Sequence, residues 1–270
     1  MTEKHNIDLA LRFDKLLQSI NSLETLADGF CLPELKDADR IHLSSVGLAS
    51  ELKHRTGSAI VPTITLRDSN RQNILGTVAF AIFAGIENLF LVRGDPYDAK
   101  NEREPKNVYD VKTVSSIVSS VRKMESHLAT GKRVTILSPI NLVRIEDEKY
   151  LQSIKEREGA GVDLFVAESL FEDVADHLKR VRKVREAGIA HPIIHTIFPL
   201  KSMEDALNCV RKFGWSISEE EIDGLKQKGA EFGLEKAKER YRDLLNNKDQ
   251  AEGACISTRG DHDIARAITA

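Results

Sequence analysis

Two clusters of charged side chains, each placed directly after an apolar segment, are the part of this chain best suited to chemistry. Arg67-Asp68-Ser69-Asn70-Arg71 follows the β-branched run Ile60–Leu66, and Arg93-Gly94-Asp95-Pro96 follows Leu89–Val92. Burying charge is costly, so a charged cluster at the end of a buried strand indicates an opening onto a ligand site. Because the clusters carry both signs of charge, they suit a ligand with a phosphate or carboxylate group and a heteroaromatic ring.

These clusters must be positioned by strands and helices that alternate along the chain. Between them, Ile74–Ala84 has a helix-like pattern that ends at Gly85. Short apolar runs bounded by turn signals alternate with helical patterns elsewhere, which is typical of βα units and a parallel sheet. The runs expected to form strands are Asn6–Leu11, Gly29–Leu32, Ile60–Leu66, Asn88–Val92, Arg133–Leu137, Val162–Ala167, Pro192–Ile197 and Ala254–Ser257.

Eight strands predict one (β/α)8 TIM barrel that spans residues 1–270 as a single catalytic domain, near the roughly 250 residues typical of this fold. The least regular strand is Asn6–Leu11, which leads into the next helical segment with almost no loop. Helical spacing is clearest in the remaining segments, Phe13–Leu26, Leu43–Arg55, Val111–Thr130, Glu148–Glu158, Phe171–Ala187, Met203–Phe213 and Glu219–Leu245.

Polar residues at the carboxyl ends of the strands are the candidates for function, because barrels bind their ligands at that edge. Besides the two charged clusters, they are Pro33 and Glu34, Ser138 and Asn141, Glu168 and Ser169, His195 and Thr196, and Thr258 and Arg259. For His195 a packed position at the strand end is favoured over catalysis. Asp68 is also well placed to cap the helix that follows it.

Composition argues against several classes of protein. A net charge of -3 gives no basic surface for nucleic acid, and no apolar run approaches the ~20 residues of a membrane span. The three cysteines are widely spaced and form no CxxC pair, so we expect reduced thiols in a cytoplasmic protein. No HExxH, GxGxxG or GxxxxGK[ST] motif is present, so a metal site, a Rossmann fold and a P-loop are not expected.

The charged clusters also carry a family resemblance. Arg67-Asp68-Ser69-Asn70-Arg71, Ala84-Gly85-Ile86-Glu87-Asn88-Leu89 and Val92-Arg93-Gly94-Asp95-Pro96, in this order and spacing, resemble the methylenetetrahydrofolate reductase family. The resemblance implies a (β/α)8 enzyme that reduces the methylene bridge of a tetrahydropterin to a methyl group. It also implies tetrahydrofolate or a related pterin as substrate, with FAD and NADH or NADPH as cofactors.

The resemblance implies a role for individual residues. Asp95 would lie close to the flavin and the folate, with Arg93 along the flavin, although an Arg93–Asp95 salt bridge is the alternative. Tyr109 and Asp110 match the segment before a helix in the flavin-binding region, although Asp110 could be a plain helix cap. The other matched positions are Lys155 at the flavin phosphates, Glu168 in place of a glutamine that binds the pterin, and Thr63 in place of a flavin-contacting histidine.

The chain departs from the family at its N-terminus. The family's catalytic glutamate on the first strand, followed by Pro-Pro, is missing, and Pro33 stands where the family has a threonine. Asp8 on the expected first strand and Glu34 after the second are the nearest carboxylates. Three functions therefore stay open: a reductase, a pterin- or flavin-binding barrel that serves as a partner or transfer subunit, and a structural, catalytically silent paralogue. A homo-oligomer and an electron-transfer partner also stay open.

Overall fold

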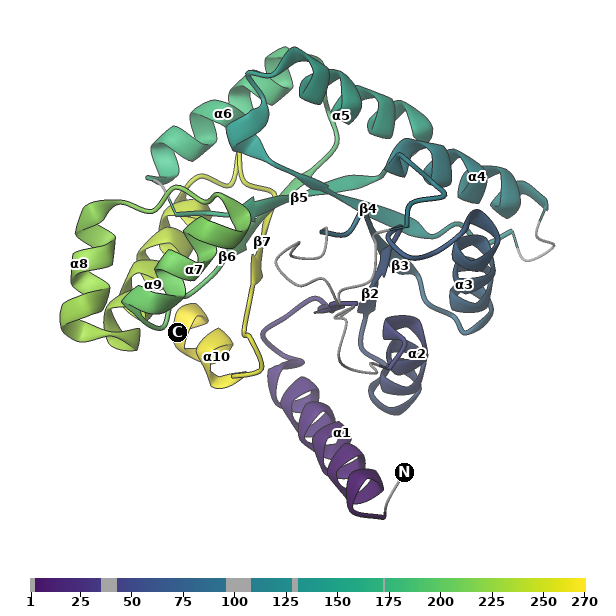
Figure 1. Ribbon diagram of the computed structural model, residues 1–270, viewed down its shortest axis with the longest axis horizontal. Helices are drawn as coiled ribbons and strands as arrows, with labels where there is room; N and C mark the ends of the chain where they lie inside the picture. The colour runs from purple at the N-terminus through teal and green to yellow at the C-terminus, as the bar shows by residue number, and fades with distance from the viewer. Residues whose placement is uncertain (1–2, 35–42, 96–107, 128–130, 172) are drawn as a thin grey trace. The chain divides into compact units, whose positions relative to one another are not determined.

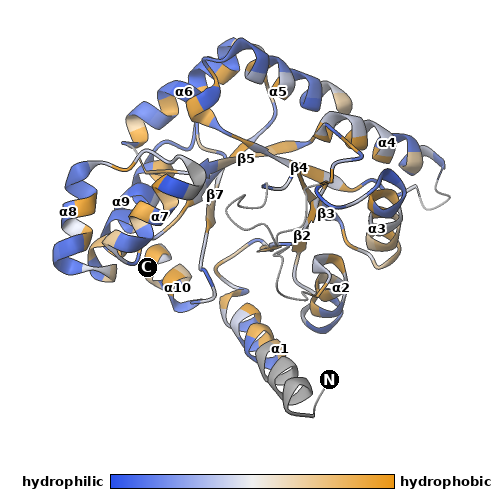
Figure 2. Cartoon of the chain, in the orientation of Figure 1, coloured by the Kyte–Doolittle hydropathy of each residue, from blue (hydrophilic) through white to orange (hydrophobic). Residues whose placement is uncertain are grey.

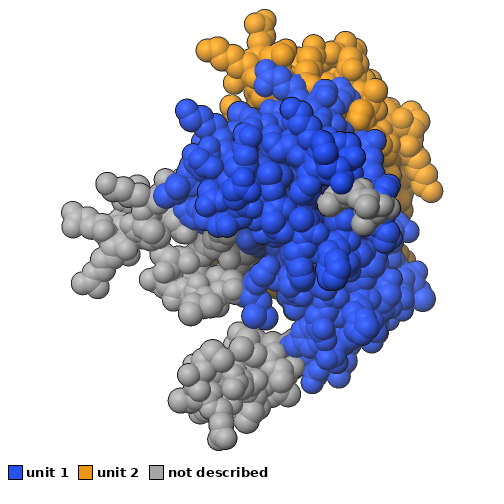
Figure 3. Space-filling model, turned by 90° about the vertical axis from the view of Figure 1, so that its right-hand side faces the viewer, with its two compact units in different colours: residues 1–138, 156–163 blue, residues 139–155, 164–270 orange. Residues whose placement is uncertain are grey.

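The computed structural model describes residues 3–34, 43–95, 108–127, 131–171 and 173–270 (Figure 1). The chain divides into two compact units, Met1–Ser138 with Glu156–Asp163 and Pro139–Lys155 with Leu164–Ala270 (Figure 3). Each unit is described by itself below. No helix in the described ranges is both long and apolar enough to cross a bilayer.

The first unit is built from parallel strands that pair in chain order. Residue Phe30 pairs with Ile60, Thr63 with Phe90, and Asn88 with Thr135. The strands are β1 (Phe30–Leu32), β2 (Ile60–Thr65), β3 (Asn88–Val92) and most of β4 (Thr135–Ile140). The helices are α1 (Glu3–Leu23), α2 (Ser45–Thr56), α3 (Arg71–Phe83), α4 (Val114–His127) and the end of α5 (Glu148–Ala160).

The second unit repeats the pattern. Its strands are parallel, with Phe165 paired to Ile193 and Ile194 paired to Gly253, and the register shifts between Ala167 and Ser169. The strands are β5 (Leu164–Ser169), β6 (Ile193–Ile197) and β7 (Gly253–Ile256). The helical elements are the 3-10 turn η1 (Leu142–Arg144), α6 (Val174–Glu186), α7 (Met203–Phe213), α8 (Glu219–Lys228), α9 (Ala230–Asn246) and α10 (Asp263–Thr269).

These parallel strands alternate with helices as in a TIM barrel, and seven of the eight expected strands are confirmed. The apolar residues of the strands form the core, and Ile60, Leu89 and Phe165 are almost completely buried. Figure 2 shows the apolar strands between helices whose outer faces are hydrophilic, most clearly at α5 and α6. The pattern of apolar runs therefore identifies the core strands correctly.

The expected first strand is wrong, because Asn6–Leu11 lies inside α1. From Glu3 to Leu23 the chain has no glycine or proline, and its leucine, lysine and arginine residues favour a helix. Ile20 and Leu23 are buried on one side of the helix, at helical spacing. Asp8 therefore lies on a helix and not at a strand end. Only its backbone belongs to the described part of the structure.

The long helix expected at Glu219–Leu245 is also wrong, because it is two helices separated at Gly229. This glycine has a φ of +59°, a conformation that ends α8 and that side chains rarely allow. Four residues later, Gly233 passes so close to Leu200 that an added Cβ would lie 1.8 Å from the Leu200 carbonyl oxygen. The break therefore lets α9 approach the segment after β6.

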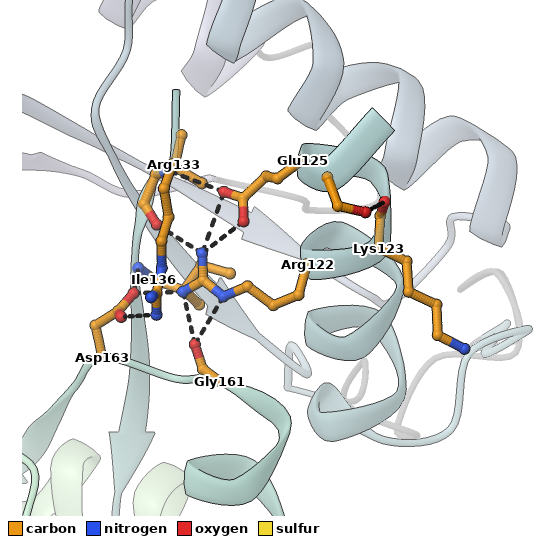
Figure 4. A network of polar contacts seen from close by, with 9 residues as sticks. Arg122, Lys123, Glu125, Arg133, Ile136, Gly161 and Asp163 are labelled. Atoms are coloured by element: carbon orange, nitrogen blue, oxygen red, sulfur yellow. Dashed lines mark hydrogen bonds and ion pairs between the residues drawn. The ribbon is translucent and has the colours of Figure 1, made fainter. Parts of the chain in front are cut away.

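Arg122 on α4 connects three segments of the first unit through its guanidinium group (Figure 4). It donates to the carbonyl oxygens of Gly161 (2.6 Å) and Val134 (2.9 Å) and to the carboxylates of Glu125 (2.9 Å) and Asp163. A Cβ on Gly161 would lie 2.9 Å from Arg122 Nε, so only glycine allows this approach. The network fixes α4 against the chain just before β4 and the turn after α5.

We expect Arg122→Ala to lower the free energy of unfolding by about 3 kcal/mol, because it removes the cationic donor shared by two carboxylates and two carbonyls, although Asp163 and Glu125 keep their other donors, Arg133, Ile136 N–H and Val134 N–H. Lys179→Ala is the control, because Lys179 forms its ion pair with Asp176 on the surface. The side chain of Lys179 is 63% exposed and that of Asp176 is 58% exposed. The control should change stability by at most about 0.5 kcal/mol. Urea unfolding measures both, and similar losses would contradict a special role for Arg122.

Candidate functional site

The carboxyl ends of β2 and β3 lie next to one another and continue their hydrogen bonding past the last strand residues. The N–H of Leu66 donates to the carbonyl of Val92 at 3.0 Å, and the N–H of Arg67 donates to the carbonyl of Arg93 at 3.0 Å. The two charged clusters therefore begin at the same edge of the sheet, as the sequence predicts.

Arg93 and Asp95 are both exposed in the turn after β3. The Arg93 guanidinium lies over the ring of Tyr109, 4.8 Å from its centroid. The alternative Arg93–Asp95 salt bridge is not among the ion pairs of the described residues. Pro96, the last residue of this cluster, lies outside the described residues.

Tyr109 and Asp110 hold the neighbouring segments together. The Tyr109 hydroxyl donates to the carbonyl of Gly94 at 3.0 Å, and the Asp110 carboxylate accepts from the N–H of Arg71 at 2.9 Å. Because Arg71 is the first residue of α3, Asp110 supports a helix that lies 39 residues earlier in the chain. One oxygen of its carboxylate is therefore already engaged within the protein.

Asp68 does not cap α3, contrary to expectation. The cap is Asn70, whose side chain accepts from the N–H of Asn73 at 2.9 Å. Asp68 has a φ of +58° and is bonded to Val108, accepting its N–H at 3.1 Å and donating to its carbonyl at 2.7 Å. A left-handed residue two positions before the cap cannot reach the first turn of the helix as the cap does.

Glu34, at the carboxyl end of β1, is bonded to the end of β2. Its carboxylate accepts both the N–H (2.6 Å) and the hydroxyl (2.8 Å) of Thr65. Thr63 lies earlier in β2, is 8% exposed, and accepts the Ser45 hydroxyl at its carbonyl. Glu34 is therefore at the ligand edge of the sheet, whereas Thr63 is within the strand.

An open cleft of about 660 Å³ lies beside Glu34 and Asp68 in the first unit. The amides of Gln72 and Asn73 and the ring of Phe80 also line it. The two carboxylates make this lining rich in hydrogen-bond acceptors. The cleft therefore suits a ligand that presents N–H donors beside an apolar or aromatic surface.

Lys155 and Glu168 belong to the second unit. Glu168, near the end of β5, accepts from the side-chain amide of Asn141 at 2.7 Å, and both residues are at predicted strand ends. Lys155 is exposed on α5. The structure therefore brings Glu168 and Asn141 together and leaves the Lys155 ammonium accessible to an anion.

His195 is packed in the interior, as the sequence favoured. It is completely buried on β6, and its Nδ1 lies 2.9 Å from Nε2 of His177 on α6. Burial, then the neighbouring His177 and Arg185, lowers the pKa of His195 from 6.5 to about 3. A neutral imidazole in this position is a structural group with no access to a ligand.

The sequence does not predict one aromatic group at the strand ends of the second unit. Phe198 follows β6 and packs against Phe171 and Trp215, with ring centroids 6.1 Å and 5.3 Å away. The Arg259 guanidinium lies 4.9 Å from the centroid of Phe198 and pairs with Asp205. Arg259 was expected at this edge, but nothing local in the sequence indicates its ring partner.

Comparison with known proteins supports the family resemblance that the two charged clusters carry. The sequence model described as methylenetetrahydrofolate reductase matches residues 13–246. The chain belongs to this family. The match covers most of the chain and begins after Asp8. None of the curated proteins is significantly similar to the chain.

Solved structures of enzymes align with the chain at low sequence identity. EDTA monooxygenase from Chelativorans sp. BNC1 aligns with a TM-score of 0.54 and 9% identity over 95% of this chain and 86% of that chain. A 2,3-dimethylmalate lyase of the PEP mutase/isocitrate lyase superfamily aligns with a TM-score of 0.48 and 11% identity, over 67% of this chain and 63% of that chain, which is under two thirds of the lyase. At these identities the first comparison supports the α/β fold alone.

We expect stability to depend on the protonation of His195. Its pKa of about 3 in the folded state is below the ordinary 6.5, so the unfolded chain binds the extra proton as pH falls through 6.5. Stability is therefore complete above pH 6.5 and decreases toward pH 3, by up to about 1.4 kcal/mol per pH unit. Urea unfolding at pH 7 and pH 5 should show a smaller loss in His195→Leu than in the wild type.

His127→Gln is the control for this experiment, because His127 is exposed on α4. It should keep the pH dependence of the wild type. An equal pH dependence in His195→Leu would show that other groups cause it.

Proposed function

We propose that this protein reduces the methylene group of a tetrahydropterin to a methyl group by hydride transfer. Membership of the methylenetetrahydrofolate reductase family supports the reaction class. The observation that carries the proposal is the exposed carboxylate of Asp95 at the end of β3, in a turn whose neighbours are fixed by hydrogen bonds. The substrate is tetrahydrofolate or a related pterin, and residues 1–270 act as one barrel-type catalytic domain.

The reaction needs one proton and one hydride. A proton delivered to N10 breaks the bond between N10 and the methylene carbon, which leaves a cationic iminium at N5. Hydride addition to that carbon then gives the methyl group. Asp95 stabilises the positive charge that develops before hydride addition, because a carboxylate on a fixed turn needs little reorganisation as that charge appears.

Glu34 is the better of the two candidate proton donors. It stands at the carboxyl end of β1 and is held by Thr65, whereas Asp8 lies on α1. A catalytic acid must come within hydrogen-bond distance of the atom it protonates, and a carboxylate at the carboxyl end of a strand is better placed for that than one on α1. Glu168, held by Asn141, would accept from the amino and ring N–H groups of the pterin.

The residues present fit a bound FAD by the chemistry of their donors. Arg93 in the first unit and Lys155 in the second are each an exposed cation suited to an anionic phosphate, and the Arg93–Tyr109 pair offers a flat surface in the first unit. The family resemblance also assigns Asp110 and Thr63 to the flavin site; in the structure Asp110 accepts from the N–H of Arg71, and Thr63 is buried within β2. When bound, a flavin supplies the hydride, with NADH or NADPH as the ultimate donor.

A second candidate function is a non-catalytic pterin- or flavin-binding subunit of the same family. The replacement of the expected first strand by α1 favours it, because the strand that would carry the family's catalytic glutamate is absent from the described residues. This candidate retains ligand binding without turnover. A homo-oligomer or an electron-transfer partner would be compatible with either function.

Asp95→Asn should lower kcat by roughly 10²–10³ and leave pterin binding nearly unchanged, because the lost interaction is strongest in the transition state. Turnover of methylene-tetrahydropterin, the Kd for the pterin and the melting temperature should be measured together. Asp176→Asn is the control, an exposed aspartate on α6 that pairs only weakly with Lys179. Full turnover in Asp95→Asn would exclude Asp95 from the mechanism.

Titration of FAD with purified protein should quench the flavin fluorescence, and Arg93→Ala and Lys155→Ala should each weaken the binding. Lys183→Ala provides a control cation in the same charge class, because its ammonium pairs with Glu146 on the surface of the second unit. An unchanged fluorescence in the wild type would favour direct hydride transfer from a nicotinamide.

Glu34→Gln should lower kcat by roughly 10²–10⁴ if Glu34 delivers the proton, because glutamine still accepts from Thr65 but cannot donate a proton from a carboxyl group. Asp8→Asn should keep the wild-type kcat. The opposite result would move the proton donor to α1.

A further inference from the structure

We propose that Arg67 is a positioning residue that sets the direction of the Asp95 side chain. This inference rests on the proposed function of Asp95. The Arg67 guanidinium donates to the backbone carbonyl of Asp95, and its Nε donates to Asp68 at 3.0 Å. Arg67 is only 7% exposed, so it serves the interior of the turn and is not available as a surface cation.

The carbonyl groups on both sides of the Asp95 Cα are fixed by other segments. The carbonyl of Gly94 accepts from the Tyr109 hydroxyl at 3.0 Å, and the carbonyl of Asp95 accepts from Arg67. Each carbonyl defines the plane of its peptide bond. With both planes held, the φ and ψ angles of Asp95 are restricted, and so is the direction of the Cα–Cβ bond from which its carboxylate projects.

Asp68 in turn holds Arg67. One carboxylate oxygen of Asp68 accepts from Arg67 Nε, and the other accepts from the N–H of Val108 at 3.1 Å. The backbone N–H of Asp68 also donates to the Val108 carbonyl at 2.7 Å, which fixes a residue whose φ is +58°. Non-glycine residues rarely adopt this conformation without such support. These hydrogen bonds form an interlock of Arg67, Asp68, Asp95 and Val108. The interlock joins three segments: the ends of β2 and β3 and the chain before α4.

Gly94 allows the close approach that this interlock requires. Its φ is +84°, and an added Cβ would lie 3.0 Å from the Cβ of Arg67 and 3.3 Å from the Cβ of Thr65. Any side chain at this position would push the turn away from Arg67. Arg67, Gly94 and Asp68 are therefore all needed to place the carboxylate of Asp95.

The decisive test is Arg67→Lys in the presence and absence of Asp95→Asn. Lysine keeps the charge but has no planar fork, so it cannot serve both Asp68 and the Asp95 carbonyl. We expect Arg67→Lys to lower kcat by roughly 10- to 100-fold with little change in KM, because a small misplacement of a catalytic group has this cost. In the Asp95→Asn background the same substitution should have almost no further effect on kcat.

Arg71→Lys is the matched control, an exposed arginine of the same cluster whose guanidinium contacts the Ser116 hydroxyl at 3.2 Å. It should keep the wild-type kcat. Equal losses from Arg67→Lys in both backgrounds would overturn the proposal, because Arg67 would then act independently of Asp95. If Arg67→Lys does not fold, Asp68→Asn replaces it: asparagine tolerates a positive φ but has one acceptor oxygen, so it cannot accept from both Arg67 Nε and the Val108 N–H, and the support of Arg67 is weakened.

A second measurement separates this inference from the proposed function. Amide hydrogen exchange followed by NMR needs no substrate, so it applies even if the wild type does not turn over a methylene-tetrahydropterin. We expect Arg67→Lys to speed exchange at residue 67, whose N–H donates to the Arg93 carbonyl, by roughly tenfold or more, with the amides of β3 unchanged. Unchanged exchange at residue 67 would overturn the positioning role, whereas absent turnover alone would overturn only the proposed function.

Discussion

Guanidinium groups that are mostly shielded from solvent hold each unit together at the points where segments distant in sequence meet. Arg67 and Arg122 in the first unit and Arg240 in the second are each bonded to a carboxylate and to at least one backbone carbonyl. A buried charge is tolerated only when its donors are satisfied, so each arginine requires all its partners to be in place at once. The three groups therefore act as long-range constraints that apolar packing alone would not provide.

The candidate site combines this rigidity with exposure. Arg67 is buried and, together with Asp68, fixes the backbone of the turn, whereas Arg93 and Asp95 are exposed and stay accessible. A charged motif that looks uniform in sequence thus contains two kinds of residue. This division of roles suits catalysis. A carboxylate held in one orientation needs less reorganisation than a mobile one when charge develops in the transition state, so it stabilises that charge more strongly.

The N-terminal part of the chain is where this protein departs most from what its family predicts. The segment that should form the first strand is part of α1, and its polar–apolar pattern is compatible with both structures over so short a stretch. The uninterrupted run of helix-favouring residues decides for the helix. Glu34 is then the carboxylate at the carboxyl end of the first strand of the described sheet.

The sequence by itself determined the alternation of strands and helices, seven of the strands, and the residues at the strand ends. These features follow from local periodicity and from turn residues, which act over a few positions. Only the tertiary structure decided which partners those residues have: Asp68 bonds to Val108, Asp110 supports α3, and His195 meets His177. Such partners are separated by 18 to 40 residues, and their contact depends on how the elements pack, which no local pattern encodes.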